Sequence, residues 1–162
     1  MADRLLVRLS ELLRAMLDDA SAQTLPLRME LELTRKYLEI EQARFGNRLV
    51  IEWRVDDSVL DAPVPSLSVL PLVENAVRHG LSKKVGPGHL GIGARRDRES
   101  LVLTVEDDGL GATLPLQYGL GVDNTRQRLD AFYGGRAGLD IDTAPQRGFR
   151  VAIRIPLAQE RT

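Results

Sequence analysis

The sequence predicts an α+β fold in which one mixed sheet carries helices on one face and is preceded by N-terminal helices. Two observations predict it. Apolar residues recur at helical spacing through most of the first 45 residues. From Leu49 onward, alternating apolar and polar stretches are instead mixed with single helical segments, in the order strand–helix–strand–strand–helix–strand–strand. Adjacent strand pairs mixed with single helices favour one sheet with its helices on one face.

The first part of the chain is predicted to be helical. Over residues 3–20, apolar residues recur at spacings of three and four with charged residues between them, as on one face of an amphipathic helix. A second helix is expected over about residues 27–45, where Gly46 suits the C-cap position. We therefore expect residues 1–45 to form a helical segment and residues 46–162 to form a separate domain.

Five strands and two helices are predicted after Gly46. The first helix can be capped by Ser66 and is expected to extend to about His79. The turn between the second and third strands is tight and charged, around Arg98 and Glu99. The expected strands cover residues 49–55, 89–97, 100–107, 137–144 and 148–157, and the second helix covers residues 122–134.

The composition excludes several classes of function. The chain has 23 acidic and 22 basic residues and few aromatic ones, which argues against a nucleic-acid or anionic-membrane partner. It contains no cysteine and only two histidines, so cysteine–zinc sites are excluded and a histidine-based metal site is disfavoured. No apolar run approaches the ~20 residues of a membrane span, and the N-terminus lacks the apolar block of a signal peptide. We expect a soluble, cytoplasmic chain that does not bind nucleic acid.

The first candidate site is the predicted helix "LPLVENAVRHG", residues 70–80. On a helical wheel its apolar residues share one arc, and Glu74, Asn75, Arg78 and His79 fill the opposite arc, with Asn75 and His79 stacked at i and i+4. An ordinary amphipathic helix with a solvated face explains this pattern on its own. If the polar face instead meets a ligand, Asn75 offers an amide oxygen suited to Mg²⁺, and Glu74 offers a carboxylate that could orient an attacking group.

The second candidate site is "VEDDGLGA", at the end of the predicted strand over residues 100–107. A hairpin turn is the simple alternative, because Asp-Gly is a strong turn signal. Against it, the residues that follow stay loop-like through Gly121. An aspartate fixed at a strand end can accept a hydrogen bond from an exocyclic amine, and Gly109 and Gly111 beside it let the backbone approach a flat ring. Such an acceptor favours adenine over guanine.

The third candidate site is "YGLGVDNTRQRL", where Gly119 and Gly121 open a predicted helix. A helix N-terminus cleared by glycine can bind phosphate, although a plain loop followed by a helix is also consistent with the pattern. Neither "GLGATL" nor "GLGVDN" completes the G-x-G-x-x-G pattern of a dinucleotide fold, and a P-loop is absent. Taken together and in this order, the three segments supply a cation ligand, an adenine acceptor and a phosphate cradle.

The same three segments resemble the N, G1 and G2 boxes of the ATP-binding domain of histidine kinases, in the superfamily that also contains gyrase, heat-shock and mismatch-repair ATPases. More narrowly, "LPLRMELELTRKYLEIEQARFGNRL" and "RGFRVAIRIP" are similar to the LytS-like sensor histidine kinases. The resemblance covers about residues 25–157. It implies the two-layer α/β sandwich of this superfamily, often called the Bergerat fold, with helices on one face of a mixed sheet.

The resemblance also implies roles for individual residues. Asn75 would bind the Mg²⁺ that bridges the ATP phosphates, and Glu74 would assist phosphoryl transfer or orient the nucleophile. Asp107 would accept from the adenine amino group, with Gly109 and Gly111 shaping the wall around the purine.

The remaining implied nucleotide contacts lie on the N-box helix and around the second glycine pair. Arg78 and His79 would face the nucleotide from the helix. Gly119, Leu120 and Gly121 would belong to the lid near the phosphates. Asn124 would come from the helix after the lid, and Arg128 also matches the family's pattern in that helix.

The partners that the resemblance implies are a response regulator and an acceptor-histidine helix. No stretch of the family's "HFLFN" kind occurs here, so the accepting histidine is expected to lie outside this chain, in a parent anchored in the inner membrane. Residues 1–45 would be a remnant of the dimerisation and linker region and could form a homodimer. Leu70 replaces a frequent Gln, and Phe149 replaces a common Thr.

Three other functions compete with a histidine kinase. One is a serine protein kinase of the same fold, resembling anti-sigma factors, although "YLEIEQARF" argues against it. Another is a non-catalytic interaction module that pairs through Leu5 to Leu17. The last is an α+β domain without a ligand.

Overall fold

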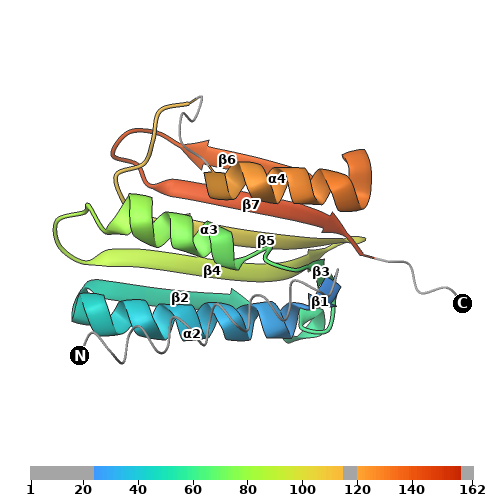
Figure 1. Ribbon diagram of the computed structural model, residues 1–162, viewed down its shortest axis with the longest axis horizontal. Helices are drawn as coiled ribbons and strands as arrows, with labels where there is room; N and C mark the ends of the chain where they lie inside the picture. The colour runs from blue at the N-terminus through green and yellow to red at the C-terminus, as the bar shows by residue number, and fades with distance from the viewer. Residues whose placement is uncertain (1–23, 115–119, 158–162) are drawn as a thin grey trace, which may run out of the picture.

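The computed structural model of the protein describes residues 24–114 and 120–157. The described residues form two layers, a five-stranded sheet and a layer of helices on one of its faces (Figure 1). The edge strand over residues 49–55 pairs in parallel with its neighbour, and all other neighbouring strands are antiparallel. The sheet is therefore mixed, as predicted. In sheet order the strands are β2 (Leu49–Val55), β4 (Gly88–Asp97), β5 (Ser100–Asp107), β7 (Phe149–Pro156) and β6 (Gly138–Thr143).

Among the residues that the structure describes, three α-helices cover the sheet. Figure 1 shows α2 (Leu27–Phe45) in front of β2, α3 (Leu70–Asn75) near the middle of the sheet and α4 (Leu120–Tyr133) over β6 and β7. A π-helix, η3 (Ala76–Leu81), continues α3. The remaining short elements are the antiparallel pair β1 (Thr24–Pro26) and β3 (Pro63–Pro65) and the turns η1 (Gly46–Arg48), η2 (Asp57–Val59) and η4 (Gly134–Arg136).

The sheet forms because apolar and polar residues alternate along its strands. The strands β2, β4, β5 and β7 turn one set of side chains toward the helices, where many of them are buried, and the other set toward the open face. Burial of the first set removes apolar area from water and supplies most of the driving force for this packing. The most deeply buried members from the strands are Leu90, Ile92, Leu101, Leu103, Ile153 and Ile155.

Helix α2 packs into the same core as the sheet. Its apolar stripe is buried against α3 and β2, and Gly46 ends it with a φ of 63°, as predicted for a glycine C-cap. The buried members of the stripe are Leu27, Leu31, Leu33, Tyr37 and Leu38. The division of the chain at residue 45 stays a prediction, and the helix expected over residues 3–20 lies outside the described residues.

One predicted helix cap is wrong. Helix α3 begins at Leu70 rather than next to Ser66, and the side chain of its N-cap residue, Val69, makes no capping hydrogen bond. The N–H groups of Leu67 and Val69 instead donate to the carboxylate of Glu30, a residue of α2 that is far from them in the sequence. A local capping rule cannot detect such a partner.

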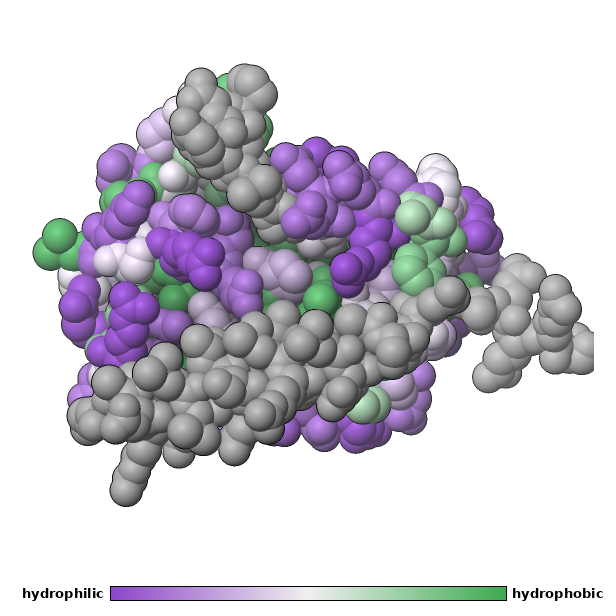
Figure 2. Space-filling model, viewed as in Figure 1, coloured by the Kyte–Doolittle hydropathy of each residue, from purple (hydrophilic) through white to green (hydrophobic). Residues whose placement is uncertain are grey.

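None of the helices in the described residues is long and apolar enough to span a membrane. On the helix side, Figure 2 shows a mainly hydrophilic surface in which hydrophobic residues appear only in small separate areas.

Candidate functional site

Asp107 ends β5 with its side chain on the helix side of the sheet. It lies opposite Leu90 of β4 and Phe149 of β7, and Leu90 belongs to the core. The Asp107 residue is only 8% exposed. Its Oδ1 accepts a hydrogen bond of 2.8 Å from the N–H of Gly109, whereas its buried Oδ2 has no partner among the described residues. A buried carboxylate oxygen without a partner is uncommon and marks a place where a donor can bind.

Burial raises the pKa of Asp107 to about 6, from an ordinary value of 3.8. The N–H of Gly109 and the ammonium of Lys84 act in the opposite direction, and the charge of Asp108 adds to the rise. Asp107 is therefore ionised at neutral pH and can accept from an amine through its free oxygen, and protonation as the pH falls below about 6 weakens this acceptor.

Both carboxylate oxygens of Asp108, unlike those of Asp107, have partners within the protein. Its Oδ1 accepts from the backbone N–H of His89 at 2.8 Å, and its Oδ2 lies 2.7 Å from Nδ1 of His89 and 2.9 Å from Nζ of Lys84. Although burial raises the pKa of Asp108, these bonds leave it below the ordinary value. Of the two aspartates that the sequence places at this strand end, only Asp107 keeps an unused acceptor oxygen.

Glycines bring three backbone segments into contact around Asp107. A Cβ on Gly80, in η3, would lie 2.5 Å from Oδ1 of Asp107, and one on Gly109 would lie 2.3 Å from the carbonyl oxygen of Gly80. A Cβ on Gly111 would lie 2.0 Å from the carbonyl oxygen of Ala144, and one on Gly148 would lie 2.2 Å from that of Asp107. The end of η3, the loop after β5 and the β6–β7 turn therefore meet at distances that only glycine allows.

Sequence reasoning missed Gly80, Gly148 and Thr143. The Thr143 hydroxyl donates to the carbonyl of Gly148 at 2.7 Å and accepts from the N–H of Ala112 at 3.0 Å, so it ties the loop after β5 to the β6–β7 turn. The two glycines were visible as "RHG" and "RGF", but nothing in a single sequence distinguishes a glycine in backbone contact from one in an open turn.

The predicted polar helix divides into an α-helical and a π-helical part. Asn75 is the last residue of α3, and η3 begins at Ala76, where bonds such as Ser82 N–H to Val77 carbonyl, 2.9 Å, span five residues. The predicted apolar arc is buried. The i to i+4 stacking of Asn75 and His79 assumed a uniform α-helix, and that assumption is wrong because a π-turn lies between them.

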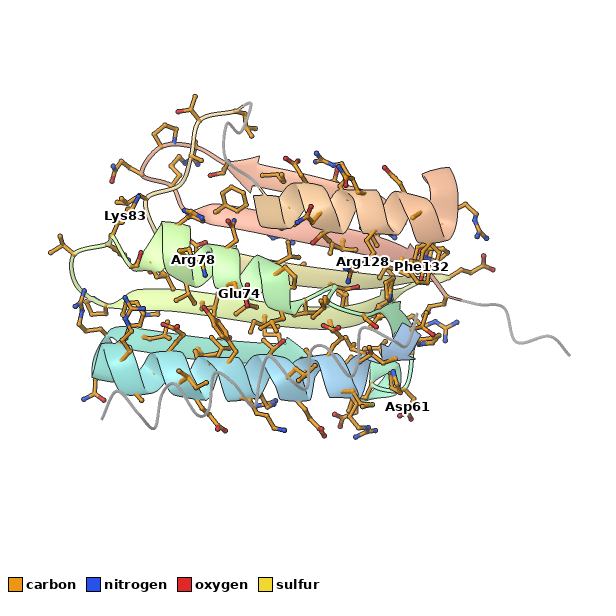
Figure 3. The ribbon with its side chains drawn as sticks, viewed as in Figure 1. Asp61, Glu74, Arg78, Lys83, Arg128 and Phe132 are labelled. Carbon is orange, nitrogen blue, oxygen red and sulfur yellow. The ribbon has the colours of Figure 1, made fainter. Side chains whose placement is uncertain are left out.

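The four polar residues of this helix have different surroundings. Asn75 is half-buried, whereas Arg78 and His79 are exposed. Glu74 is half-buried on the side of α3 that faces α2 (Figure 3). Burial raises its pKa, Arg78 lowers it and Glu41 of α2 raises it further.

Helix α4 begins at Leu120, at the second glycine pair, as predicted. Asn124 is exposed in its first part, while Val122 and Leu129 are buried on the opposite side. Gly119 lies outside the described residues. In the described part of the chain, no group of three or more acidic, histidine or cysteine side chains could hold a metal ion.

A cavity of about 570 Å³ opens mainly on the face of the sheet that the helices leave uncovered, and it reaches the end of the sheet, where Asp107, Asp108 and Thr143 also line it. Its central side chains are paired: Arg54 lies 2.8 Å from Glu52 and 3.5 Å from Glu106, and Arg150 lies 3.7 Å from Glu106. These ion pairs compensate one another's charge, so we place the candidate site at Asp107, whose Oδ2 has no partner among the described residues.

Comparisons with known proteins agree with the resemblance. A family model for histidine kinases matches residues 1–49. The sensor protein LytS of Staphylococcus epidermidis is 32% identical over 96% of this chain and 28% of its own length. The sensor histidine kinase BtsS of Escherichia coli is 33% identical over 81% of this chain and 24% of its own length. The chain thus spans about a quarter of these two relatives.

Solved structures agree on the fold. The histidine kinase domain of a blue-light activated histidine kinase from Erythrobacter litoralis matches with a TM-score of 0.68 and 24% identity. The match covers 96% of this chain and 76% of that domain. The predicted α+β sandwich is therefore confirmed as the fold of histidine kinase catalytic domains.

Proposed function

Because this chain is a homologue of the LytS-like sensor histidine kinases with the fold of their catalytic domain, we propose that it is the ATP-binding catalytic portion of such a kinase. It transfers the γ-phosphoryl group of ATP to a histidine outside residues 1–162. The observation that carries the proposal is the free, buried Oδ2 of Asp107 beside a wall of glycines. An unused carboxylate oxygen next to such a wall fits the amino edge of adenine.

The chain's own residues supply binding and orientation. Asp107 accepts from the adenine amine, and Gly109 and Gly111 let the purine approach the backbone. Asn75 offers its amide oxygen to Mg²⁺, a hard cation that prefers oxygen ligands. When bound, Mg²⁺ neutralises charge on the transferring phosphoryl group.

The other site residues act around the phosphates and the nucleophile. Arg78 and His79 extend from η3, and Gly119, Leu120, Gly121 and Asn124 belong to the lid and the start of α4. Glu74 orients the incoming nucleophile from its half-buried position. Burial there raises the pKa of Glu74 above its ordinary value, toward the pH at which the chain would work. Phosphoryl transfer depends chiefly on positioning and charge stabilisation, so no covalent intermediate on this chain is required.

The partners follow from the same proposal. An acceptor-histidine helix of the longer parent receives the phosphoryl group and passes it to a response regulator. The apolar stripe of α2 is used inside the domain, so a homodimer formed by the N-terminal helices would use residues 3–20. The chain would work in the cytoplasm, with its parent anchored in the inner membrane.

Replacing Asn75 by alanine should remove the Mg²⁺-dependent part of ATP binding. We expect the affinity for MgATP to fall by about 10-fold, as for loss of one ligand to a charged group, while the affinity for ATP in EDTA changes by less than about 2-fold. Calorimetric titration with and without Mg²⁺ measures both. Asn47→Ala, an exposed asparagine in η1, is the matched control. Unchanged MgATP affinity in Asn75→Ala would rule out this residue as the metal ligand.

Kinase activity is tested by supplying the acceptor in trans. The chain is mixed with γ-labelled ATP and a separate acceptor-histidine helix fragment from a LytS-type relative. We expect acid-labile label on the fragment with the parent chain and much less with Asn75→Ala. ATP binding without any transfer would favour the non-catalytic interaction module, and label on serine would favour a serine protein kinase.

A further inference from the structure

The segment that leads into α3 is held in an unfavourable backbone conformation. Leu67 has a φ of 63°, in the left-handed region that side chains other than glycine seldom adopt. The helix that follows is only six residues long, and its N-cap residue, Val69, makes no side-chain capping bond. Residues 66–69, here called the α3 entry segment, therefore need support from elsewhere in the fold.

Glu30 of α2 supplies the first support. Its residue is 0% exposed, and its two carboxylate oxygens accept from the N–H groups of Leu67 and Val69, the latter at 3.3 Å. The Thr34 hydroxyl donates to the backbone carbonyl of Glu30 at 2.8 Å, inside α2. A carboxylate is costly to bury, but here it meets the unpaired donors and positive end of α3. The side-chain hydrogen bonds of Glu30 lead to the backbone of the α3 entry segment and of Leu70, the first residue of α3.

Arg128 of α4 supplies the second support. Its Nη1 donates to the carbonyl of Ser66, the residue next to the strained Leu67. Figure 3 shows Arg128 on the side of α4 that faces α3. Within the α3 entry segment, Ser68 also donates through Oγ to the carbonyl of Pro65 at 2.5 Å. The segment is thus tied to α2 through Glu30 and to α4 through Arg128.

We propose that Glu30 and Arg128 are positioning residues of the nucleotide site, which clamp the α3 entry segment from opposite sides and so set where α3 and α4 stand relative to each other. This inference rests on the proposed function, because the residue it positions on α3 is Asn75 and the one on α4 is Asn124.

The clamp reaches both residues through short rigid elements. Asn75 ends α3, so a displacement of the α3 entry segment moves it with little attenuation. Asn124 lies four residues before Arg128, one turn away on the same side of α4. A bond from Arg128 to the α3 entry segment therefore fixes the separation between the metal ligand and the start of the lid helix. Metal-bridged phosphates are the part of a nucleotide most sensitive to such a separation, because ligand geometry around Mg²⁺ is strict.

The test compares Glu30→Gln and Arg128→Met with the parent chain. Glutamine keeps the shape of Glu30 but presents an amide N–H₂ to backbone donors, and methionine keeps the stem of Arg128 without its donors. We expect each variant to weaken MgATP binding by about 10-fold while ATP binding in EDTA changes by less than about 2-fold. Arg128→Lys should recover most of the lost affinity. Exposed residues on the same helices provide the controls, Glu32→Gln and Arg126→Met, which should match the parent.

The outcomes separate positioning from simple stabilisation. A lower melting temperature with both affinities unchanged in the folded chain would overturn the positioning role, and so would an equal loss of both affinities. If Glu30→Gln fails to fold, Arg128→Met decides alone by the same criteria. If the parent chain binds no ATP, the proposed function and this inference are overturned together. If Glu30→Gln and Arg128→Met both bind MgATP as tightly as the parent does, only the positioning role of Glu30 and Arg128 is overturned.

Discussion

Replacing Asp107 by asparagine is expected to weaken adenine-nucleotide binding by roughly 10- to 100-fold, the range for losing a hydrogen bond to a charged group. The asparagine oxygen can still accept from the N–H of Gly109, as Oδ1 does now at 2.8 Å. Its N–H₂ then stands where the free Oδ2 stood and faces the adenine amine, donor against donor. Titration with ATP and ADP measures the loss. The matched control is Asp61→Asn, an exposed aspartate far along the chain.

The same substitution should make the folded chain more stable at neutral pH. Burial raises the pKa of Asp107 to about 6, so its ionisation above that pH opposes folding. This cost is largest above about pH 6 and disappears as the pH falls toward the ordinary value of 3.8. We expect Asp107→Asn to raise the free energy of unfolding by about 1–2 kcal/mol at pH 7, partly offset by the buried N–H₂, and by nearly nothing at pH 4. Urea unfolding at the two pH values is the measurement. A stability gain of the same size at both would contradict the buried, ionised carboxylate.

Replacing Gly111 by alanine is expected to cost about 3 kcal/mol or more of unfolding free energy. Gly111 has a φ of 66°, and an added Cβ would lie 2.0 Å from the carbonyl oxygen of Ala144 and 2.9 Å from that of Gly148. All of these atoms belong to the backbone, so the clash cannot be relieved by rotating a side chain. The loop after β5 must shift, and nucleotide affinity should fall with it.

Gly134→Ala separates the clash from the backbone conformation. Gly134 has a similar φ of 59°, but a Cβ there would meet nothing within 4 Å. We expect a cost of about 1 kcal/mol for this variant, from the left-handed conformation alone. Equal destabilisation by the two substitutions, measured by urea unfolding, would show that the contact between Gly111 and the β6–β7 turn is not needed.

Local patterns in the sequence predicted most of the fold. The strand over residues 49–55 and the helix over residues 27–45 alternate or repeat regularly, and the structure has both with the predicted bounds. The Asp-Asp-Gly end of the strand over residues 100–107 was singled out from its local pattern, and the resemblance to histidine kinases then assigned the adenine contact to Asp107. What the sequence could not indicate is which aspartate keeps a free oxygen. That depends on two residues from elsewhere in the chain: His89 of β4 and Lys84 of the loop before β4 both contact the carboxylate of Asp108.

The remaining features depend on contacts between distant residues. Glu30 appeared as one of several acids on an amphipathic helix, and only the packing of α2 against α3 buries it beneath the α3 entry segment. The π-helix after Asn75 carries Gly80, which lies against the side chain of Asp107 from a distant strand. A helical wheel assumes a constant 3.6 residues per turn and cannot show this change.

The central claim is that the free oxygen of Asp107 recognises the amino edge of adenine. Calorimetric titration of the full chain with MgATP and with MgGTP, at one pH near 7.5, tests it most directly. The claim predicts that MgATP binds at least about 10-fold more tightly, because the guanine carbonyl would face the ionised carboxylate without a proton between them. Equal affinity for the two nucleotides, or tighter binding of MgGTP, would contradict it.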